Sequence, residues 1–307
     1  MLGENKERPG NLLVIWTILR HVMHCSHTVV LILHLAAADL LVLITLPLWI
    51  DSLVHSWVFG EAFCRVLVYI VSVCMLSSIF FITLMGVERF LAICHPFVMM
   101  RWKTESVMNR CLVVLWLLAL LLGVPALLTQ PSDESDGTEL CFIKEFSLST
   151  QAIILLCLET LVGFIVPFVI LSICYCLVAA RLRKMSFNSK QKSMVLVYAV
   201  VISFALCMLP YHIINIIDLA CILGSGTEHE CGLVFSSGAL VFISSSVNPV
   251  LYALSSRNLQ GSLEESRLIR LFQEMATHTN KLRELVVQQQ AGQRAANTQV
   301  QLMSDSV

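Results

Sequence analysis

One long apolar stretch, from Cys64 to Pro96, constrains the fold of this chain more than any other feature. Between Val66 and Val87 its only polar groups are hydroxyls, thiols and one phenol. As an α-helix, Cys64–Cys94 would be about 45 Å long at ~1.5 Å per residue, whereas the hydrocarbon core of a bilayer is only ~30 Å thick. We therefore predict a tilted transmembrane helix, with a cysteine at one end and the charged pair Glu88-Arg89 near the other.

The composition favours a membrane protein. Hydrophobic residues make up 57% of the chain and charged residues 13%, whereas charged residues make up about 25% of a soluble domain. The formal net charge of −1 argues against nucleic acid as a partner, because surfaces that bind nucleic acid are strongly basic. Most of the 12 cysteines lie inside apolar segments, where cysteine behaves as a small buried hydrophobe.

Seven apolar segments follow one another along the chain. They are residues 11–22, 28–54, 64–94, 106–128, 150–184, 190–223 and 231–254. We expect an all-α membrane protein whose seven-transmembrane helix bundle occupies residues 11–254. A residual segment, 1–10, precedes the bundle, and a cytoplasmic amphipathic helix and tail, 255–307, follow it.

The first apolar segment is short. It has 12 residues, whereas a spanning helix needs ~20. We therefore expect helix 1 to be truncated at its extracellular half. An interfacial helix that lies outside the bundle is the alternative.

The charges of the loops predict the orientation. One set of loops is basic and carries Arg20, Arg101, Lys103, Arg181, Arg183, Lys184, Lys190 and Lys192. The opposite set is acidic and carries Glu61, Asp133, Glu134, Asp136, Glu139, Glu228 and Glu230. Basic loops remain on the cytoplasmic side, so we predict a multi-pass plasma-membrane protein with a cytoplasmic carboxyl terminus.

Other classes of seven-helix protein are disfavoured. A retinal pump needs a lysine in its last helix for the Schiff base, and residues 231–252 contain none. Transporters show repeats and broken helices, and proton relays need several intramembrane carboxylates. Here only Asp39 and Glu159 lie far inside a span. No catalytic constellation is present in the sequence, so we do not expect an enzyme.

Three motifs occur in the order that a known family shows. Glu88-Arg89-Phe90 ends the third segment, Cys207-Met208-Leu209-Pro210 lies in the sixth, and Asn248-Pro249-x-x-Tyr252 ends the seventh. Together with Trp116 and Pro167, they resemble the rhodopsin-like (class A) G-protein-coupled receptors over residues 10 to about 260. Taken alone, Glu88-Arg89 would also fit a membrane anchor with a neighbouring counter-ion.

The resemblance implies a switch that acts on a heterotrimeric G protein. Glu88 would hold Arg89 at rest as an adjacent ion pair, and the freed arginine would meet the G protein. Met208 stands where the family has a tryptophan, whereas Pro210 still supplies the kink. The implied coupling residues are Glu88, Arg89, Tyr175, Met208, Pro210, Asn248, Pro249 and Tyr252. Arrestin, a receptor kinase and membrane lipids are the further partners implied.

Within the family, residues 163–168, 209–215 and 244–252 look most like the leukotriene B4 receptors. This resemblance implies an extracellular chemoattractant lipid carboxylate as ligand and inhibitory-type G proteins as partners. The candidate ligand-binding residues are Arg65, Tyr69, Lys144, Glu159, Tyr211, His212 and Asn215. Glu159 either binds a ligand hydroxyl or is a structural partner of His212 or Asn215.

Two alternatives remain open for the function. Val68 and Ala152 stand where the subfamily leads us to expect histidine and arginine, so a chemoattractant peptide is the second candidate ligand. The acidic outer loops would suit such a peptide if it were basic. A truncated, non-signalling form that associates with a full-length receptor is the other alternative.

The resemblance also implies a disulfide and an ion site. Cys64 would pair with Cys141, and a second bridge between Cys221 and Cys231 is an open alternative to free thiols. A sodium ion would bind beside Asp39, because a carboxylate at membrane depth is costly without a partner. Its implied ligands are Asp39, Ser78, Ser244, Ser245 and Asn248. The alternative is an Asp39 that is protonated or bonded only to Asn248, and no other metal or cofactor is expected.

Overall fold

The computed structural model describes most of the predicted bundle. The described residues are 10–21, 26–55, 57–95, 97–99, 105–128, 130–133, 139–145, 149–183, 202, 205–206, 208–214, 216–217, 219–220, 242–249, 269 and 273. The predicted tail helix (apart from residues 269 and 273), Tyr252 and the second bridge, Cys221–Cys231, lie outside these residues.

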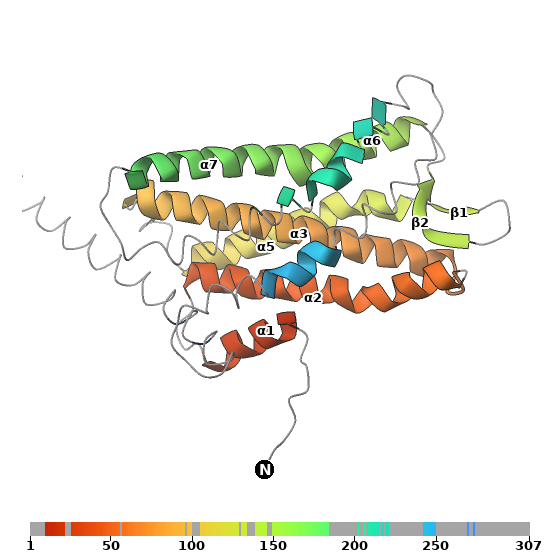
Figure 1. The fold of residues 1–307 in the computed structure, drawn as a ribbon, viewed down its shortest axis with the longest axis horizontal. Helices are drawn as coiled ribbons and strands as arrows, with labels where there is room; N and C mark the ends of the chain where they lie inside the picture. The colour runs from red at the N-terminus through yellow and green to blue at the C-terminus, as the bar shows by residue number, and fades with distance from the viewer. Residues whose placement is uncertain are drawn as a thin grey trace, which may run out of the picture.

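Long apolar helices form the frame of the molecule (Figure 1). They are α2 (His27–Val54), α3 (Glu61–Cys94), α5 (Glu105–Gly123) with its 3-10 extension Val124–Leu128, and α6 (Ser149–Thr160) joined to α7 (Val166–Arg183) by the π-helical turn Leu161–Ile165. In the described part of the chain, four spans are long and apolar enough to cross a membrane. The second to fifth predicted segments are therefore confirmed as helices.

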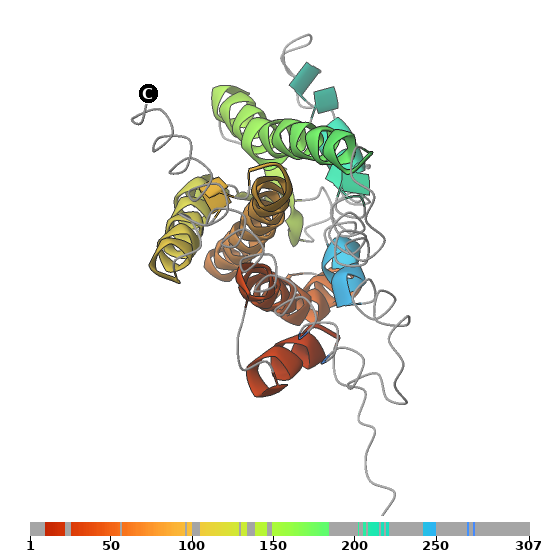
Figure 2. The same ribbon diagram turned by 90° about the vertical axis from the view of Figure 1, so that its left-hand side faces the viewer.

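Helix α3 is the centre of the arrangement. It packs against α2, α5 and α7, and the end-on view shows it surrounded by these three helices (Figure 2). Its side chains Ile79, Phe81 and Ile82 are fully buried. Lipid is as apolar as these side chains, so the hydrophobic effect does not drive the helices together. Close packing and dispersion between well-fitting surfaces stabilise the contacts instead.

Helix α1 (Gly10–His21) belongs to the bundle. It packs against α2, and the Asn11 side-chain amide donates a 2.9 Å hydrogen bond to the backbone carbonyl of Ser245. Gly10 lies so close to Pro249 that an added Cβ would come within 2.7 Å of the proline Cβ. These contacts place α1 against both α2 and residues 242–249. The alternative of an interfacial helix lying apart from the bundle is therefore wrong.

The acidic segment after α5 contains a β-hairpin, where the sequence led us to expect only a loop. Strand β1 (Gln130–Asp133) pairs with β2 (Glu139–Glu145) in antiparallel register, with Asp133 opposite Glu139. The two strands lie at one end of the helices (Figure 1). We call this the hairpin end of the bundle, and the opposite end, where α2 begins and α3 ends, the Arg89 end.

Candidate functional site

A hydroxyl group links the charged pair at the Arg89 end. Arg89 Nη2 donates a 2.7 Å hydrogen bond to Thr28 Oγ1, and this hydroxyl donates a 2.7 Å hydrogen bond to Glu88 Oε2. All three residues are buried. Among the described residues, Glu88 and Arg89 form no direct ion pair. The predicted adjacent ion pair is therefore wrong, because consecutive side chains on a helix point in different directions.

Tyr175 lies one turn of α3 from this pair. Its hydroxyl is 3.6 Å from the position that a Cβ on Gly86 would take, and Leu171 Cδ2 is only 2.4 Å from the same position. Helices α3 and α7 can therefore approach closely here because residue 86 is a glycine. Tyr175 is thus placed beside Gly86, two residues before Glu88 on α3, and its role in coupling stays a prediction.

The polar centre of the bundle is built around Asp39. Its Oδ1 accepts a 3.3 Å hydrogen bond from Ser78, and its Oδ2 accepts a 2.7 Å hydrogen bond from the Asn248 side-chain amide. Ser244 and Ser245 are also buried in this part of the chain. The structure thus brings two of the four predicted neighbours, Ser78 and Asn248, into contact with Asp39.

This donor set fits a small hard cation. It offers one carboxylate and neighbouring hydroxyl oxygens, which are ligands that hard cations prefer. The charge of a single carboxylate matches a monovalent ion. In the described residues, no group of three or more His, Cys, Asp or Glu side chains offers a site for a transition metal. Met208 is 2% exposed and belongs to the same apolar core that surrounds this centre.

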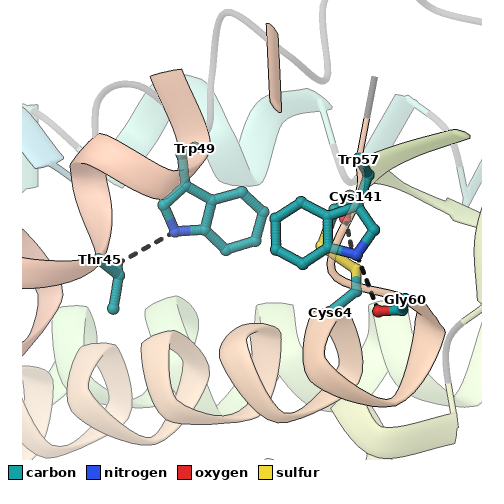
Figure 3. Close-up of a disulfide and its surroundings, with 6 residues drawn as sticks. All are labelled: Thr45, Trp49, Trp57, Gly60, Cys64 and Cys141. Atoms are coloured by element: carbon teal, nitrogen blue, oxygen red, sulfur yellow. Dashed lines mark hydrogen bonds between the residues drawn. A yellow bond between two sulfur atoms is a disulfide. The ribbon is translucent and has the colours of Figure 1, made fainter. Parts of the chain in front are cut away.

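At the hairpin end, a disulfide joins Cys64 of α3 to Cys141 of β2, with 5.7 Å between their Cα atoms. This confirms the predicted pair. Trp49 and Trp57 pack around the bridge, and each indole N–H is satisfied locally: Trp49 donates to Thr45 Oγ1 and Trp57 to the Gly60 carbonyl (Figure 3). The bridge therefore attaches the hairpin to the start of α3, where two tryptophans pack around it.

Three of the candidate ligand-binding residues lie together. The Tyr211 hydroxyl donates a hydrogen bond to Glu159 Oε1. The ring of the fully buried His212 stacks on Phe164, with centroids 4.9 Å apart and an interplanar angle of 22°. Gly163 in the π-helical turn lies beside this ring, at a distance where an added Cβ would be in van der Waals contact with His212 Cε1, 3.4 Å away. The partner of Glu159 that we describe, Tyr211, is neither of the two residues that the sequence suggested.

The other candidates lie elsewhere or outside the described part. Arg65 pairs with Glu61 one turn away on α3. Tyr69 faces α5, where its hydroxyl donates a 3.2 Å hydrogen bond to the Leu120 carbonyl and its ring covers Gly123. The side chain of Lys144 and all of Asn215 fall outside the description. Tyr69 is therefore not grouped with Glu159, Tyr211 and His212.

Two polar contacts between helices were not predicted from the sequence. One is Thr28, described above. The other is His34, whose Nδ1 accepts a 3.3 Å hydrogen bond from the Trp116 indole, with Phe81 packed edge-on against the tryptophan at 5.5 Å. The sequence signal in each case is only a single polar residue in an apolar helix, and it does not identify the partner.

Comparison with known proteins agrees with these features. Residues 10–252 match the family model described as 7 transmembrane receptor (rhodopsin family). Leukotriene B4 receptor 1 of Homo sapiens is 35% identical over 261 residues, which cover 82% of this chain and 74% of the relative. Leukotriene B4 receptor 2 of Homo sapiens is 33% identical over 282 residues, 86% of this chain and 76% of the relative.

A third relative is not named as a leukotriene receptor. Chemerin-like receptor 2 of Mus musculus is 31% identical over 265 residues, which cover 84% of this chain and 74% of the relative. The relatives are receptors and not enzymes. With the motifs in order and the match over most of its length, the chain belongs to the rhodopsin family of seven-transmembrane receptors.

Proposed function

We propose that this receptor recognises an extracellular lipid carboxylate of the leukotriene B4 type and signals through inhibitory heterotrimeric G proteins. Membership of the family implies an extracellular ligand and a G-protein partner. The observation that carries the finer proposal is the 33–35% identity to leukotriene B4 receptors 1 and 2 over more than four fifths of the chain. In this proposal the hairpin end faces outside and the Arg89 end faces the cytoplasm.

Arg65 is the residue that we assign to the ligand carboxylate. Its side chain is only about one-third exposed, and its present partner is Glu61, an exposed carboxylate at i−4 on the same helix. Exposed pairs of this kind contribute only ~0.2–1 kcal/mol. A ligand carboxylate can therefore compete with Glu61 for the guanidinium, particularly if it binds in a bidentate geometry.

Glu159 and Tyr211 are the residues that we assign to a ligand hydroxyl. Tyr211 already donates to Glu159, and a carboxylate has acceptor sites for more than one donor. A hydroxyl of the ligand can therefore add to this pair without leaving a buried polar group unpaired.

The test of this proposal uses two substitutions with opposite expected signs. Arg65→Gln should weaken the binding of leukotriene B4 about tenfold, because it removes a charge-assisted hydrogen bond. Glu61→Gln should strengthen it roughly two- to fivefold, because the competing carboxylate is lost. Arg110→Gln, at an exposed arginine of α5, is the control. The methyl ester of the ligand should bind equally to the parent and to Arg65→Gln.

A chemoattractant peptide is the second candidate. It is favoured by the acidic residues of the hairpin, Asp133, Glu139 and Glu145, which would suit a basic peptide. A receptor that is silent to leukotriene B4 but catalyses nucleotide exchange in response to a basic chemoattractant peptide would favour this candidate over the lipid.

A further inference from the structure

We propose that Thr28 is the residue that holds Arg89 in the resting receptor, and that loss of the Arg89–Thr28–Glu88 bridge releases the arginine. The inference deepens the proposed coupling to G proteins and rests on it. It assigns a positioning role to a residue of α2 that lies 60 positions before Glu88 in the sequence.

The Thr28 hydroxyl acts as a donor to Glu88 and as an acceptor for Arg89. A hydroxyl has one proton to donate and can accept from other donors. Here the proton goes to Glu88 Oε2 and the oxygen accepts from Arg89 Nη2, with both distances at 2.7 Å. The hydroxyl therefore links the two charged groups, between which the structure shows no direct ion pair.

The guanidinium is held by little else in the described part of the chain. Arg89 Nε is buried and has no hydrogen-bond partner among the described residues. A buried charged donor without a partner is costly. Within the described part of the chain, the hydrogen bond that holds the Arg89 guanidinium is therefore the one to Thr28, and a partner that offered acceptors to the guanidinium would gain from its release.

Thr28 also makes the bridge sensitive to movement between helices. It is fully buried in the first turn of α2, and this turn is fixed by Ser26, whose hydroxyl accepts a hydrogen bond from the backbone N–H of Val29. A hydrogen bond weakens steeply when its length or angle changes. A small shift of α3 relative to the start of α2 would break both bonds at once, because they share one oxygen.

The first experiment measures ligand-independent nucleotide exchange per surface receptor. Thr28→Val keeps the shape of the side chain and removes the hydroxyl, so it should raise basal exchange on the order of tenfold, the change expected for loss of one hydrogen bond to a charged group. Thr28→Ser should match the parent. Thr83→Val is the matched control, since Thr83 Oγ1 donates only to the Ile79 carbonyl of its own helix.

Glu88→Gln completes the design. It should raise basal exchange like Thr28→Val, and the double variant should be no more active than the more active single variant. Basal exchange of Thr28→Val at the parent level while Glu88→Gln is raised would overturn the proposal. Equal activity of Thr28→Ser and Thr28→Val would also overturn it.

A second measurement separates this inference from the proposed coupling. Melting temperatures of the purified receptor are recorded for the parent, Thr28→Val, Glu88→Gln and the double variant. The two substitutions should be non-additive, because each removes the same bridge. Additive effects would overturn the bridge whatever the G protein does. If no variant catalyses exchange on any G protein, the proposed coupling fails, and the melting cycle still decides whether the bridge exists.

Discussion

The Asn248 side-chain amide donates a 2.7 Å hydrogen bond to Asp39 Oδ2 and so joins residues 242–249 to α2 at the centre of the bundle. The other carboxylate oxygen accepts from Ser78 of α3. One buried carboxylate thus connects three helices. Any change in the charge or occupancy of this centre must alter how the three helices fit together.

Sodium should lower the affinity for agonist through Asp39. We propose that the ion binds the carboxylate and its neighbouring hydroxyls in the resting arrangement, and linkage then requires it to oppose agonist binding. Agonist affinity measured in sodium and in a larger organic cation at equal ionic strength should differ several-fold. Asp39→Asn should abolish the difference.

Ser78 and Ser77 provide a matched pair for this test. Ser78 donates to Asp39, whereas the neighbouring Ser77 donates to the Val73 carbonyl of its own helix. Ser78→Ala should reduce the sodium effect and Ser77→Ala should leave it unchanged. A parent receptor whose agonist affinity is the same in both cations would end the sodium proposal.

Arg89→Ala should abolish G-protein nucleotide exchange and spare ligand binding. The side chain lies at the opposite end of α3 from the disulfide and Arg65, so its removal leaves the hairpin end intact. Surface receptor number and ligand binding should stay within about twofold of the parent, as expected for a site distant from the ligand. An Arg89 that served only as a membrane anchor would instead lose surface expression in proportion to signalling.

Loss of the Cys64–Cys141 bridge should destabilise the receptor. The disulfide links residues 77 positions apart, and removing a bridge of this kind typically costs ~2–4 kcal/mol. Cys64→Ser, Cys141→Ser and the double variant should lower the melting temperature by the same amount. Cys111→Ser, at a free and partly exposed cysteine, should not lower it. Peptide mass spectrometry that finds both thiols free in surface-expressed receptor would contradict the assignment.

Gly86→Ala should destabilise the contact between α3 and α7. The added methyl would meet Leu171 Cδ2 at 2.4 Å, and overpacking of this kind costs ~1–3 kcal/mol. The change is measured as a fall in melting temperature of the purified receptor. Leu171→Ala made together with Gly86→Ala should recover part of the loss. Two destabilisations that simply add would show that the close approach is not the cause.

The sequence predicted the helices well because their signal is local. Apolar runs longer than a bilayer is thick define α2 and α3 to within a few residues, and the Ser26 side chain caps the start of α2. The fifth segment was also predicted as a single span. Its π-helical turn, Leu161–Ile165, was not predicted; the turn lies beside His212, a residue distant in the sequence, and the local apolar pattern carries no sign of that contact.

The partners of polar residues were less predictable, since they depend on how helices rotate against one another. The sequence placed Glu88 beside Arg89 but gave no sign that Thr28 would stand between their side chains. The hairpin was missed for a different reason. Asp136-Gly137, a dipeptide typical of tight hairpin turns, lies between the two strands in the sequence, but the acidic residues around it are also typical of a polar loop.

The π-helical turn gives the fifth span two independent halves. The backbone N–H of Val166 donates to the carbonyl of Leu161, five residues earlier, so this turn holds one residue more than an α-helical turn. One extra residue rotates everything before it by about 100° relative to everything after it. Glu159 is thereby set to meet Tyr211, while Leu171 and Tyr175 keep their fit against Gly86. A change in the packing of one half therefore need not change the phase of the other half.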